Sequence, residues 1–394
     1  MGTATDAAQR VLDGLAGRPG SAELLELASA HNDLALVGGA VRDLLLGVTP
    51  RELDVVVAGG ASELASELAS LLPADDVRMT VHERFGTAIV EWPAGRIDIA
   101  TRRAETYACP GALPDVRPGT VAEDLARRDF TVNAIAVPLA GQGELRSVEH
   151  ALDDLAAGSL RVLHERSFRD DPTRLLRLAR YAARLGFEVE AETARLARDA
   201  LAVGALRTVS GGRVGAELWL AAEEASAGAF VVMGDLGVLA ALSLRSPYDE
   251  RLLSEAGALL PTDGSRAVLA LAVLLHDGEL TVDLELPADM PAPLTFKGAL
   301  RASQLRALLA GQPVEAVALA GALGGPQARD NAARWLSDLR HVRLEITGTD
   351  LLAAGLSEGP EVGRRLARAL DMKLDGELQG GREAELQAAL EGEP

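Results

Sequence analysis

The sequence lacks the features of a membrane-spanning or secreted protein. None of its apolar stretches approaches the length needed to span a bilayer, and the N-terminus, rich in Ala, Asp and Arg, has no continuous apolar segment of the kind found in signal peptides. The single cysteine, Cys109, excludes an internal disulfide and fits a reducing cytoplasm. We therefore predict a soluble, cytoplasmic, multidomain protein with no membrane contact, which agrees with 394 residues of which 48% are hydrophobic and 25% are charged.

An excess of positive charge is also missing. The formal net charge is −19, which repels RNA at long range. An RNA-binding function would therefore need a local concentration of positive charge. Arginines do gather at 127–128 and from 161 to 184, while acidic residues are spread through 186–290 and the C-terminus.

A glycine pair marks the first candidate site. Gly38 and Gly39 follow the strand-like residues 34–37, and without a Cβ they let backbone N–H groups approach a phosphate closely. Residues 41–46 look like the start of a helix, whose N-terminus favours an anion. Arg42 would add a mobile positive charge, so this segment is suited to a triphosphate.

Three acidic residues form the second candidate site. Glu52 and Asp54 lie on the same face of a predicted strand because side chains alternate along a strand. Asp98, in the strand-like residues 96–100, is the candidate third carboxylate. Carboxylates at this spacing suit Mg²⁺, which can assist phosphoryl transfer. A Gly-Gly pair or a Glu-x-Asp pair alone is more often structural, but their order and spacing together favour function.

A stripe of arginines follows Asp171. Arg174, Arg177, Arg180 and Arg184 recur at spacings of three, three and four, which places them on one helical face. Leucines and alanines fill the remaining positions as a packing surface. Four arginines on one stripe repel one another and favour an anionic partner. The alternative is an exposed face paired with acidic neighbours.

Four ordered motifs resemble those of a known family. They lie at residues 38–43, 52–54, 127–134 and 170–177, and residues 346–352 and 359–360 continue the similarity more faintly. They resemble the class II tRNA nucleotidyltransferases (CCA-adding enzymes) and bacterial poly(A) polymerases, which belong to the polymerase β-like nucleotidyltransferases. This chain departs from the family at Glu52, where aspartate is usual, and the effect of the longer side chain on activity is open.

The resemblance implies roles for individual residues. Glu52 and Asp54 would bind the catalytic metals, with Asp98 as a possible third catalytic carboxylate. Asp171 and Arg174 would recognise the incoming base. A carboxylate accepts hydrogen bonds and a guanidinium donates them in a fixed geometry, so together they can imitate a Watson–Crick partner. The implied nucleotide-binding set is Gly38, Gly39, Arg42, Arg128, Asp129, Asn133, Asp171, Arg174, Arg177 and Arg180, in which Arg128 and Asp129 would contact the ribose.

The expected fold is α+β. The resemblance and the composition together imply an N-terminal helical lead-in (1–30) and a polymerase β-like nucleotidyltransferase head of mixed sheet and helices (31–145). An all-helical remainder would follow as neck (146–225, with the base-recognition helix), body (226–330) and tail (331–394), of which the body and tail bind RNA in the family. The sequence leaves the oligomeric state open.

The implied activity is Mg²⁺-dependent, template-independent addition of CMP, CMP and AMP to the tRNA 3′ end from CTP and ATP, with release of pyrophosphate. The loop-like residues 107–114 favour full CCA addition over C addition alone. The alternatives are a relative of partial specificity (A-adding, CC-adding or poly(A) polymerase) and a catalytically weakened RNA-binding protein.

His276-Asp277 is similar to the metal-binding pair of phosphohydrolase domains, but without further spaced histidines it is more typical of a helix end, and no metal is assigned to it.

Overall fold

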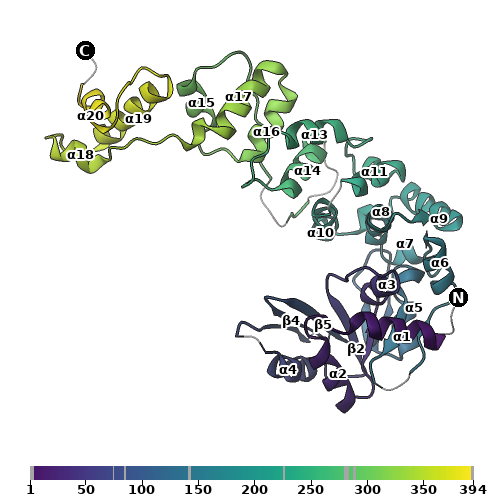
Figure 1. Ribbon diagram of the computed structural model, residues 1–394. Helices are drawn as coiled ribbons and strands as arrows, with labels where there is room; N and C mark the ends of the chain where they lie inside the picture. The colour runs from purple at the N-terminus through teal and green to yellow at the C-terminus, as the bar shows by residue number, and fades with distance from the viewer. Residues whose placement is uncertain are drawn as a thin grey trace. The chain divides into compact units, whose positions relative to one another are not determined.

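The chain forms two compact units. The computed structural model describes residues 4–73, 75–83, 86–140, 143–224, 227–278, 284–286 and 290–391. One unit is Met1–Val214 with Asp235–Ala241, and the other is Gly215–Gly234 with Leu242–Pro394 (Figure 1). The first combines a sheet with helices and the second is helical, which confirms the predicted α+β class. Within the described ranges, no helix combines the length and apolar character needed to cross a membrane.

A mixed sheet of seven strands forms the centre of the first unit. Its strand order is β3-β4-β5-β2-β1-β8-β9. The strands are β1 (Ala35–Val37), β2 (Leu53–Val57), β3 (Arg78–His82), β4 (Thr87–Trp92), β5 (Gly95–Thr101), β8 (Ile135–Pro138) and β9 (Arg146–Ser147). β2 and β5 are parallel and the other pairs are antiparallel. Val55, Ile97 and Ile99 are buried β-branched residues that suit these central strands.

Helices cover this sheet. They are α1 (Ala4–Leu15), α2 (Ser21–Ala30), α3 (Gly39–Leu45), α4 (Ala61–Leu71), α5 (Val121–Ala126) and α6 (Ala151–Ala157). α4 lies against β3, β4 and β5 (Figure 1). Its buried residues Ala61, Leu64, Ala65 and Leu68 recur at helical spacing and form one apolar stripe.

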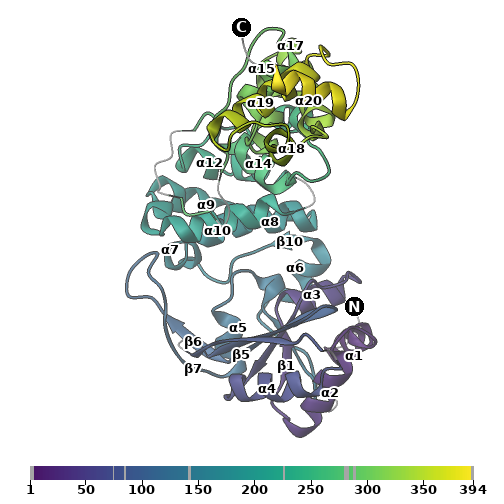
Figure 2. The same ribbon diagram turned by 90° about the vertical axis from the view of Figure 1, so that its left-hand side faces the viewer.

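Shorter elements complete the sheet-bearing part. A two-stranded ribbon of β6 (Arg103–Thr106) and β7 (Asp115–Pro118) continues from β5 (Figure 2), and a 3₁₀ turn, η2 (Thr131–Asn133), precedes β8. The turn lies within residues 127–134, the third of the four motifs that resemble the family. All three residues of η2 are buried.

The helical end of the first unit carries the arginine stripe. Its elements are β10 (Ser159–Leu160), α7 (Ser167–Asp170), α8 (Thr173–Leu185), β11 (Glu188–Val189), α9 (Ala191–Ala202), η3 (Ala205–Thr208), the first residues of α10 (Gly211–Ala222) and α12 (Val238–Ala241). α8 buries Leu175, Leu176 and Ala179 on one face. It ends at Gly186, whose φ of 65° is the left-handed conformation typical of a helix C-terminus.

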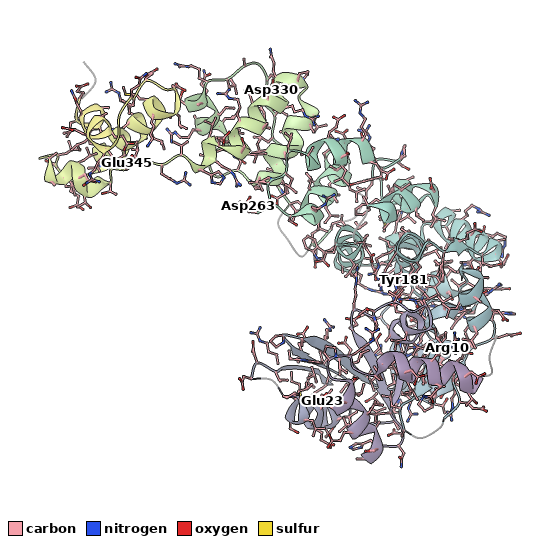
Figure 3. All side chains as sticks on the ribbon, viewed as in Figure 1. Arg10, Glu23, Tyr181, Asp263, Asp330 and Glu345 are labelled. Carbon is pink, nitrogen blue, oxygen red and sulfur yellow. The ribbon has the colours of Figure 1, made fainter. Side chains whose placement is uncertain are left out.

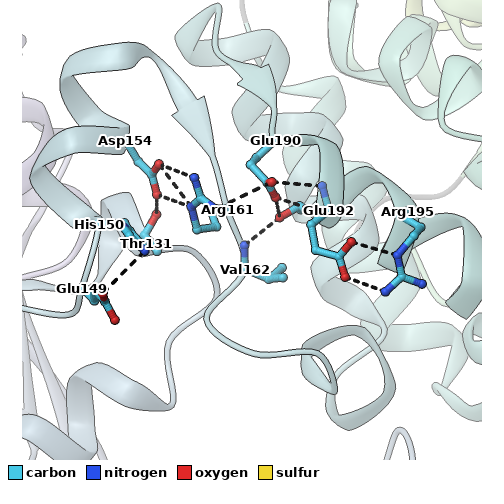
Figure 4. A network of polar contacts seen from close by, with 10 residues as sticks. Thr131, Glu149, His150, Asp154, Arg161, Val162, Glu190, Glu192 and Arg195 are labelled. Atoms are coloured by element: carbon cyan, nitrogen blue, oxygen red, sulfur yellow. Dashed lines mark hydrogen bonds and ion pairs between the residues drawn. The ribbon is translucent and has the colours of Figure 1, made fainter.

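A polar network fixes this helical end to the sheet-bearing part (Figure 4). Buried Asp154 accepts hydrogen bonds from Thr131 at 2.7 Å and from Nε of Arg161 at 3.0 Å. Arg161 also lies 3.6 Å from Glu190, whose carboxylate caps the N-terminus of α9. The N-terminus of α9 is thereby linked, through Arg161 and Asp154, to Thr131 of the 3₁₀ turn.

The second unit has no strand among its described residues. Beyond the rest of α10, its helices are α11 (Gly228–Asp235), α13 (Glu250–Gly257), α14 (Arg266–Leu275), α15 (Ala302–Leu309), α16 (Val314–Leu323), α17 (Pro326–Ser337), η4 (Leu339–His341), α18 (Gly348–Ala353), α19 (Pro360–Leu374) and α20 (Arg382–Leu390). One apolar cluster surrounds Phe296 and Trp335, and another surrounds Ile346 and Leu351. The division into a body up to residue 330 and a tail from residue 331 stays a prediction.

Candidate nucleotide and metal site

A glycine turn brings the first site residues together. Gly38 follows β1 with φ 72° and ψ −136°, a conformation that glycine adopts readily and other residues avoid. A Cβ at this position would lie 2.6 Å from Nη1 of Arg128 and 3.6 Å from Oδ2 of Asp54. A guanidinium and a carboxylate from distant segments therefore both lie against this turn. The amide of Gly38 donates to the carbonyl of Ile135 at 3.1 Å, so it is engaged within the protein.

Arg42 is fixed in place. Its side chain is 1% exposed, and Nε and Nη2 donate to Oδ1 of Asp43 at 2.8 and 2.7 Å. Nη1 donates to Asn133, and the guanidinium lies 5.3 Å from the ring centre of Tyr181. The expectation of a mobile charge at Arg42 is therefore wrong, because an adjacent carboxylate and a distant amide both hold the guanidinium.

Asp129 connects Arg42 to the arginine stripe. Its Oδ1 accepts from Nδ2 of Asn133 at 3.0 Å, and its Oδ2 accepts from Nε and Nη2 of Arg177 at 2.9 and 2.6 Å. Burial by itself would raise the pKa of Asp129, but the charge of Arg177 and the hydrogen bonds from Asn133 and Arg177 hold it well below its usual range. Asp129 is therefore ionised in the folded protein.

Tyr181 lies at the centre of this network. It is labelled on α8 in Figure 3, and its hydroxyl accepts from Nη2 of Arg177 at 3.1 Å. The guanidinium groups of Arg177 and Arg180 lie 5.4 and 5.2 Å from its ring centre. The ring of Phe130 meets it edge-on at 5.8 Å. A second link runs from Arg184 to Asp43 at 3.0 Å, so both ends of α8 are bonded to the sheet-bearing part.

The arginine stripe thus has two kinds of partner. Arg177 and Arg184 pair with buried carboxylates, which matches the alternative of acidic neighbours. Arg174 differs, since Nη2 donates to the carbonyl of Arg127 at 2.7 Å while Nη1 is buried and has no hydrogen-bond partner among the described residues. This buried donor is therefore left unused by the described part of the chain. The adjacent Asp171 accepts from Thr173 and, at 2.7 Å, from Nη2 of Arg213.

The predicted metal ligands lie on neighbouring parallel strands. Asp54 of β2 is in register with Asp98 of β5, so their side chains project from the same face, and Glu52 directly precedes β2. Burial and the charge of Glu52 raise the pKa of Asp54 to about 7, with Asp98 adding to the effect and Arg128 and Arg96 opposing it. Repulsion between unneutralised carboxylates favours a cation at this position.

Asp98 has another partner in this structure. Its two oxygens accept from Nε and Nη2 of Arg96 at 2.6 and 2.8 Å. Within the described ranges, no three His, Cys, Asp or Glu side chains converge on a common metal position. Mg²⁺ typically uses one or two carboxylates together with substrate phosphates, so Glu52 and Asp54 fit such an ion without a third protein ligand.

The comparisons with known proteins agree with this geometry. A family profile described as the Poly A polymerase head domain matches residues 34–161. A CC-adding tRNA nucleotidyltransferase of Deinococcus radiodurans is 34% identical over 92% of this chain and 90% of its own length. The chain belongs to the tRNA nucleotidyltransferase family.

For other family members, the match covers a smaller part of their own length. An A-adding tRNA nucleotidyltransferase of Geobacter sulfurreducens is 30% identical over 91% of this chain and 46% of its own length. An A-adding relative of Halalkalibacterium halodurans is 42% identical over 55% of this chain and 51% of its own length. The chain therefore spans about half the length of these curated relatives.

Solved structures of the family share the fold. An apo CCA-adding enzyme has a TM-score of 0.73 at 28% identity, with 93% of both chains covered. The Thermotoga maritima CCA-adding enzyme complexed with tRNA has a TM-score of 0.67 at 27% identity, again over 93% of both chains. A CCA-adding enzyme in complex with ATP has a TM-score of 0.70 at 28% identity over 94% of both chains.

Some residues that organise the candidate site were not predicted from the sequence. Asp124 is 2% exposed and accepts from both Arg127 and Arg128, at 2.8 and 3.0 Å. Its position four residues before Arg128 on a helix was an available signal. Glu105, with a side chain 6% exposed, bonds Arg127 and the hydroxyl of Tyr107, each at 2.9 Å. Arg127 lies 22 positions after Glu105, so no local sequence pattern predicts that these two residues pair.

Proposed function

We propose that this chain is an enzyme that transfers nucleotides from CTP and ATP to the 3′ end of tRNA and releases pyrophosphate. The observation that carries the proposal is the Gly38 turn, against which the side chains of Asp54 and Arg128 both lie. A carboxylate able to hold a divalent cation and a guanidinium able to pair with a phosphate or a ribose are the two groups that nucleotidyl transfer requires. Family members with tRNA and with ATP in their solved structures support these substrates.

The residues of the chain position the nucleotide. We assign the triphosphate and ribose to the surface formed by Gly38, Gly39 and Arg128, with Asp129, Asn133 and Arg42 fixing the shape of that surface from behind. Arg177 and Arg180 hold the Tyr181 ring against the same network. Because Asp124 holds Arg128 at 3.0 Å and Asp43 and Asn133 hold Arg42, these two guanidinium groups need little reorganisation when the nucleotide binds.

Asp171 and Arg174 supply the base-reading edge. The buried free donor of Arg174 gains a hydrogen bond only when an acceptor of the base enters. Arg213 fixes the carboxylate of Asp171 at 2.7 Å, so the accepting edge is held in one orientation. Protein groups then select the base without a nucleic-acid template.

Glu52 and Asp54 would hold Mg²⁺, with Asp98 adjacent. When bound, the ion would neutralise charge on the leaving pyrophosphate and lower the pKa of the attacking hydroxyl. The 3′-hydroxyl of tRNA attacks the α-phosphorus in line with the departing pyrophosphate, and no covalent enzyme intermediate is required.

The first candidate for the product is the complete CCA end. CCA-adding enzymes match over 93% of both chains, which supports this choice. The second candidate is addition of C residues alone, because the Deinococcus radiodurans relative that matches along nearly its whole length is a CC-adding enzyme. A weakened RNA-binding protein is the remaining alternative.

A primer-extension experiment tests the proposal. Purified protein and Mg²⁺ are incubated with tRNA ending at the discriminator base, or with one or two C residues added, and CTP, ATP or both are supplied. Extension of the shortest tRNA by CCA supports the first candidate, and extension by C residues that stops before A supports the second. Asp54→Asn should abolish extension, whereas Asp13→Asn, on an exposed face of α1, should not. Retained tRNA binding without extension of any substrate would overturn the proposed activity.

A further inference from the structure

One arginine lies among the carboxylates of the candidate metal site. The parallel pairing of β2 with β5 sets Leu53 opposite Ile97 and Asp54 opposite Asp98. Glu52 and Arg96 are the preceding residues on the two strands, so they lie on the same face as the two aspartates. On its other side, Arg96 is in register with Glu91 of β4.

The side chain of Arg96 contacts three carboxylates. Nε and Nη2 bond both oxygens of Asp98 at 2.6 and 2.8 Å, Nε lies 3.6 Å from Glu52, and Nη1 lies 3.4 Å from Glu91. An arginine guanidinium is not deprotonated in proteins, so the positive charge of Arg96 is permanent.

We propose that Arg96 is a built-in counter-ion of the metal site, which holds Asp98 and Glu52 while no divalent cation is bound and thereby lowers the affinity of Glu52 and Asp54 for that cation. This inference rests on the metal site of the proposed function. It assigns a determinant of metal affinity to a residue outside the proposed metal ligands and nucleotide-binding residues.

Electrostatics favours competition between the guanidinium and the metal. Glu52 is within ion-pair distance of Arg96, so a cation bound by Glu52 and Asp54 would lie within several ångströms of a fixed positive charge. The Arg96 side chain is 38% exposed, so solvent screens this repulsion but does not remove it. The bidentate contact also keeps Asp98 from turning toward the cation.

The effect of a divalent cation on the thermal midpoint distinguishes this inference from a purely structural role of Arg96. If Arg96 served only to stabilise the strand edges, its removal would lower the thermal midpoint equally with and without a divalent cation. If Arg96 competes with the cation, its removal lowers the midpoint of the metal-free protein and increases the stabilisation that the cation provides.

Mn²⁺ binding to the full chain, measured by electron paramagnetic resonance of the free ion, tests the inference. We expect Arg96→Gln to lower the dissociation constant about three- to tenfold and to increase the shift of the thermal midpoint caused by Mn²⁺. Arg96→Lys, which keeps the charge, should remain closer to the unaltered protein. Arg195→Gln, which removes an exposed arginine paired with Glu192 and Asp199 on α9, is the matched control and should change neither quantity.

Each outcome of this titration decides the inference. Binding that is detectable only after Arg96→Gln supports it, as does the expected tightening. Unchanged or weaker binding in Arg96→Gln, with binding lost in Asp54→Asn, overturns the role of Arg96 and leaves the metal site standing. Absence of binding in every variant overturns the inference together with the metal site. The extension assay shows separately whether the proposed activity also fails.

Discussion

Arg177 donates two hydrogen bonds, of 2.9 and 2.6 Å, to one oxygen of Asp129, which lies 48 positions earlier in the chain. The other oxygen of Asp129 accepts from Asn133, and Asn133 accepts in turn from Arg42. One continuous network thus runs from the arginine stripe of α8 to the helix that follows the glycine turn. The proposed base-reading and triphosphate-binding parts of the site are consequently held by the same bonds.

Removing Arg177 should destabilise the first unit. Arg177→Gln leaves the Asp129 carboxylate buried and without its charged partner, which costs about 2–4 kcal/mol of unfolding free energy. Urea unfolding followed by tryptophan fluorescence measures the loss. Arg195→Gln serves as the control, because both partners of that pair are about half exposed and their removal should change stability little. Equal stability of the two variants would contradict a structural role for the Arg177–Asp129 pair.

The Gly38 turn should be essential for the reaction. Gly38→Ala places a methyl group 2.6 Å from Nη1 of Arg128, so we expect about a hundredfold or greater loss of nucleotide incorporation, on the order of 3 kcal/mol. Gly47→Ala is the matched control, since Gly47 has φ 74° and no atom within 4 Å of the added Cβ. It shares the positive φ of Gly38 without the clash, so this variant should keep normal incorporation. Equal losses of activity in the two variants would assign the effect to strain alone.

The ring of Tyr181 should matter more than its hydroxyl. Tyr181→Phe removes one hydrogen bond from Arg177 but keeps the three guanidinium contacts with the ring, so its activity should stay near that of the unaltered protein. Tyr181→Leu loses all three contacts, each worth about 0.5–1 kcal/mol, and should raise the KM for CTP about tenfold. The steady-state KM for CTP with tRNA at saturation measures the effect. A larger defect in Tyr181→Phe than in Tyr181→Leu would contradict this role.

Low pH should lower the stability of the first unit because the Asp124 carboxylate becomes protonated. Although burial alone would raise the pKa of Asp124, Arg128 and Arg127 hold it below its ordinary value. Because the folded pKa lies below the unfolded one, this carboxylate stabilises the fold above about pH 4 and loses that contribution as the pH falls through the folded pKa. Asp124→Asn should lower the thermal midpoint at neutral pH and flatten its decline in acid. The exposed Asp199→Asn variant should retain the full acid dependence.

Local patterns were sufficient to place strands β1, β2 and β5 and the main acidic residues. Glycines, alternating apolar residues and the spacing of Glu52 and Asp54 identified the region around β1 and β2, and the register shows that Asp54 and Asp98 share a face. Local patterns could not predict which carboxylates the arginines pair with. Arg184 pairs with Asp43 across 141 positions, and only the folded chain brings them together.

The position of Arg42 shows the same limit. Its place after two glycines indicated a charge directed toward a ligand, but the adjacent Asp43 and the distant Asn133 enclose it. A sequence pattern identifies a charged residue near a turn, whereas the direction of its side chain depends on which groups pack around it.

Single-turnover incorporation of radiolabelled CMP into tRNA ending at the discriminator base tests the central claim most directly, with tRNA binding measured on the same samples. The account predicts labelled tRNA with the unaltered protein and a rate lower by about a thousandfold or more with Asp54→Asn, at equal tRNA affinity. Equal tRNA affinity in both proteins without incorporation from CTP or ATP by either would contradict it.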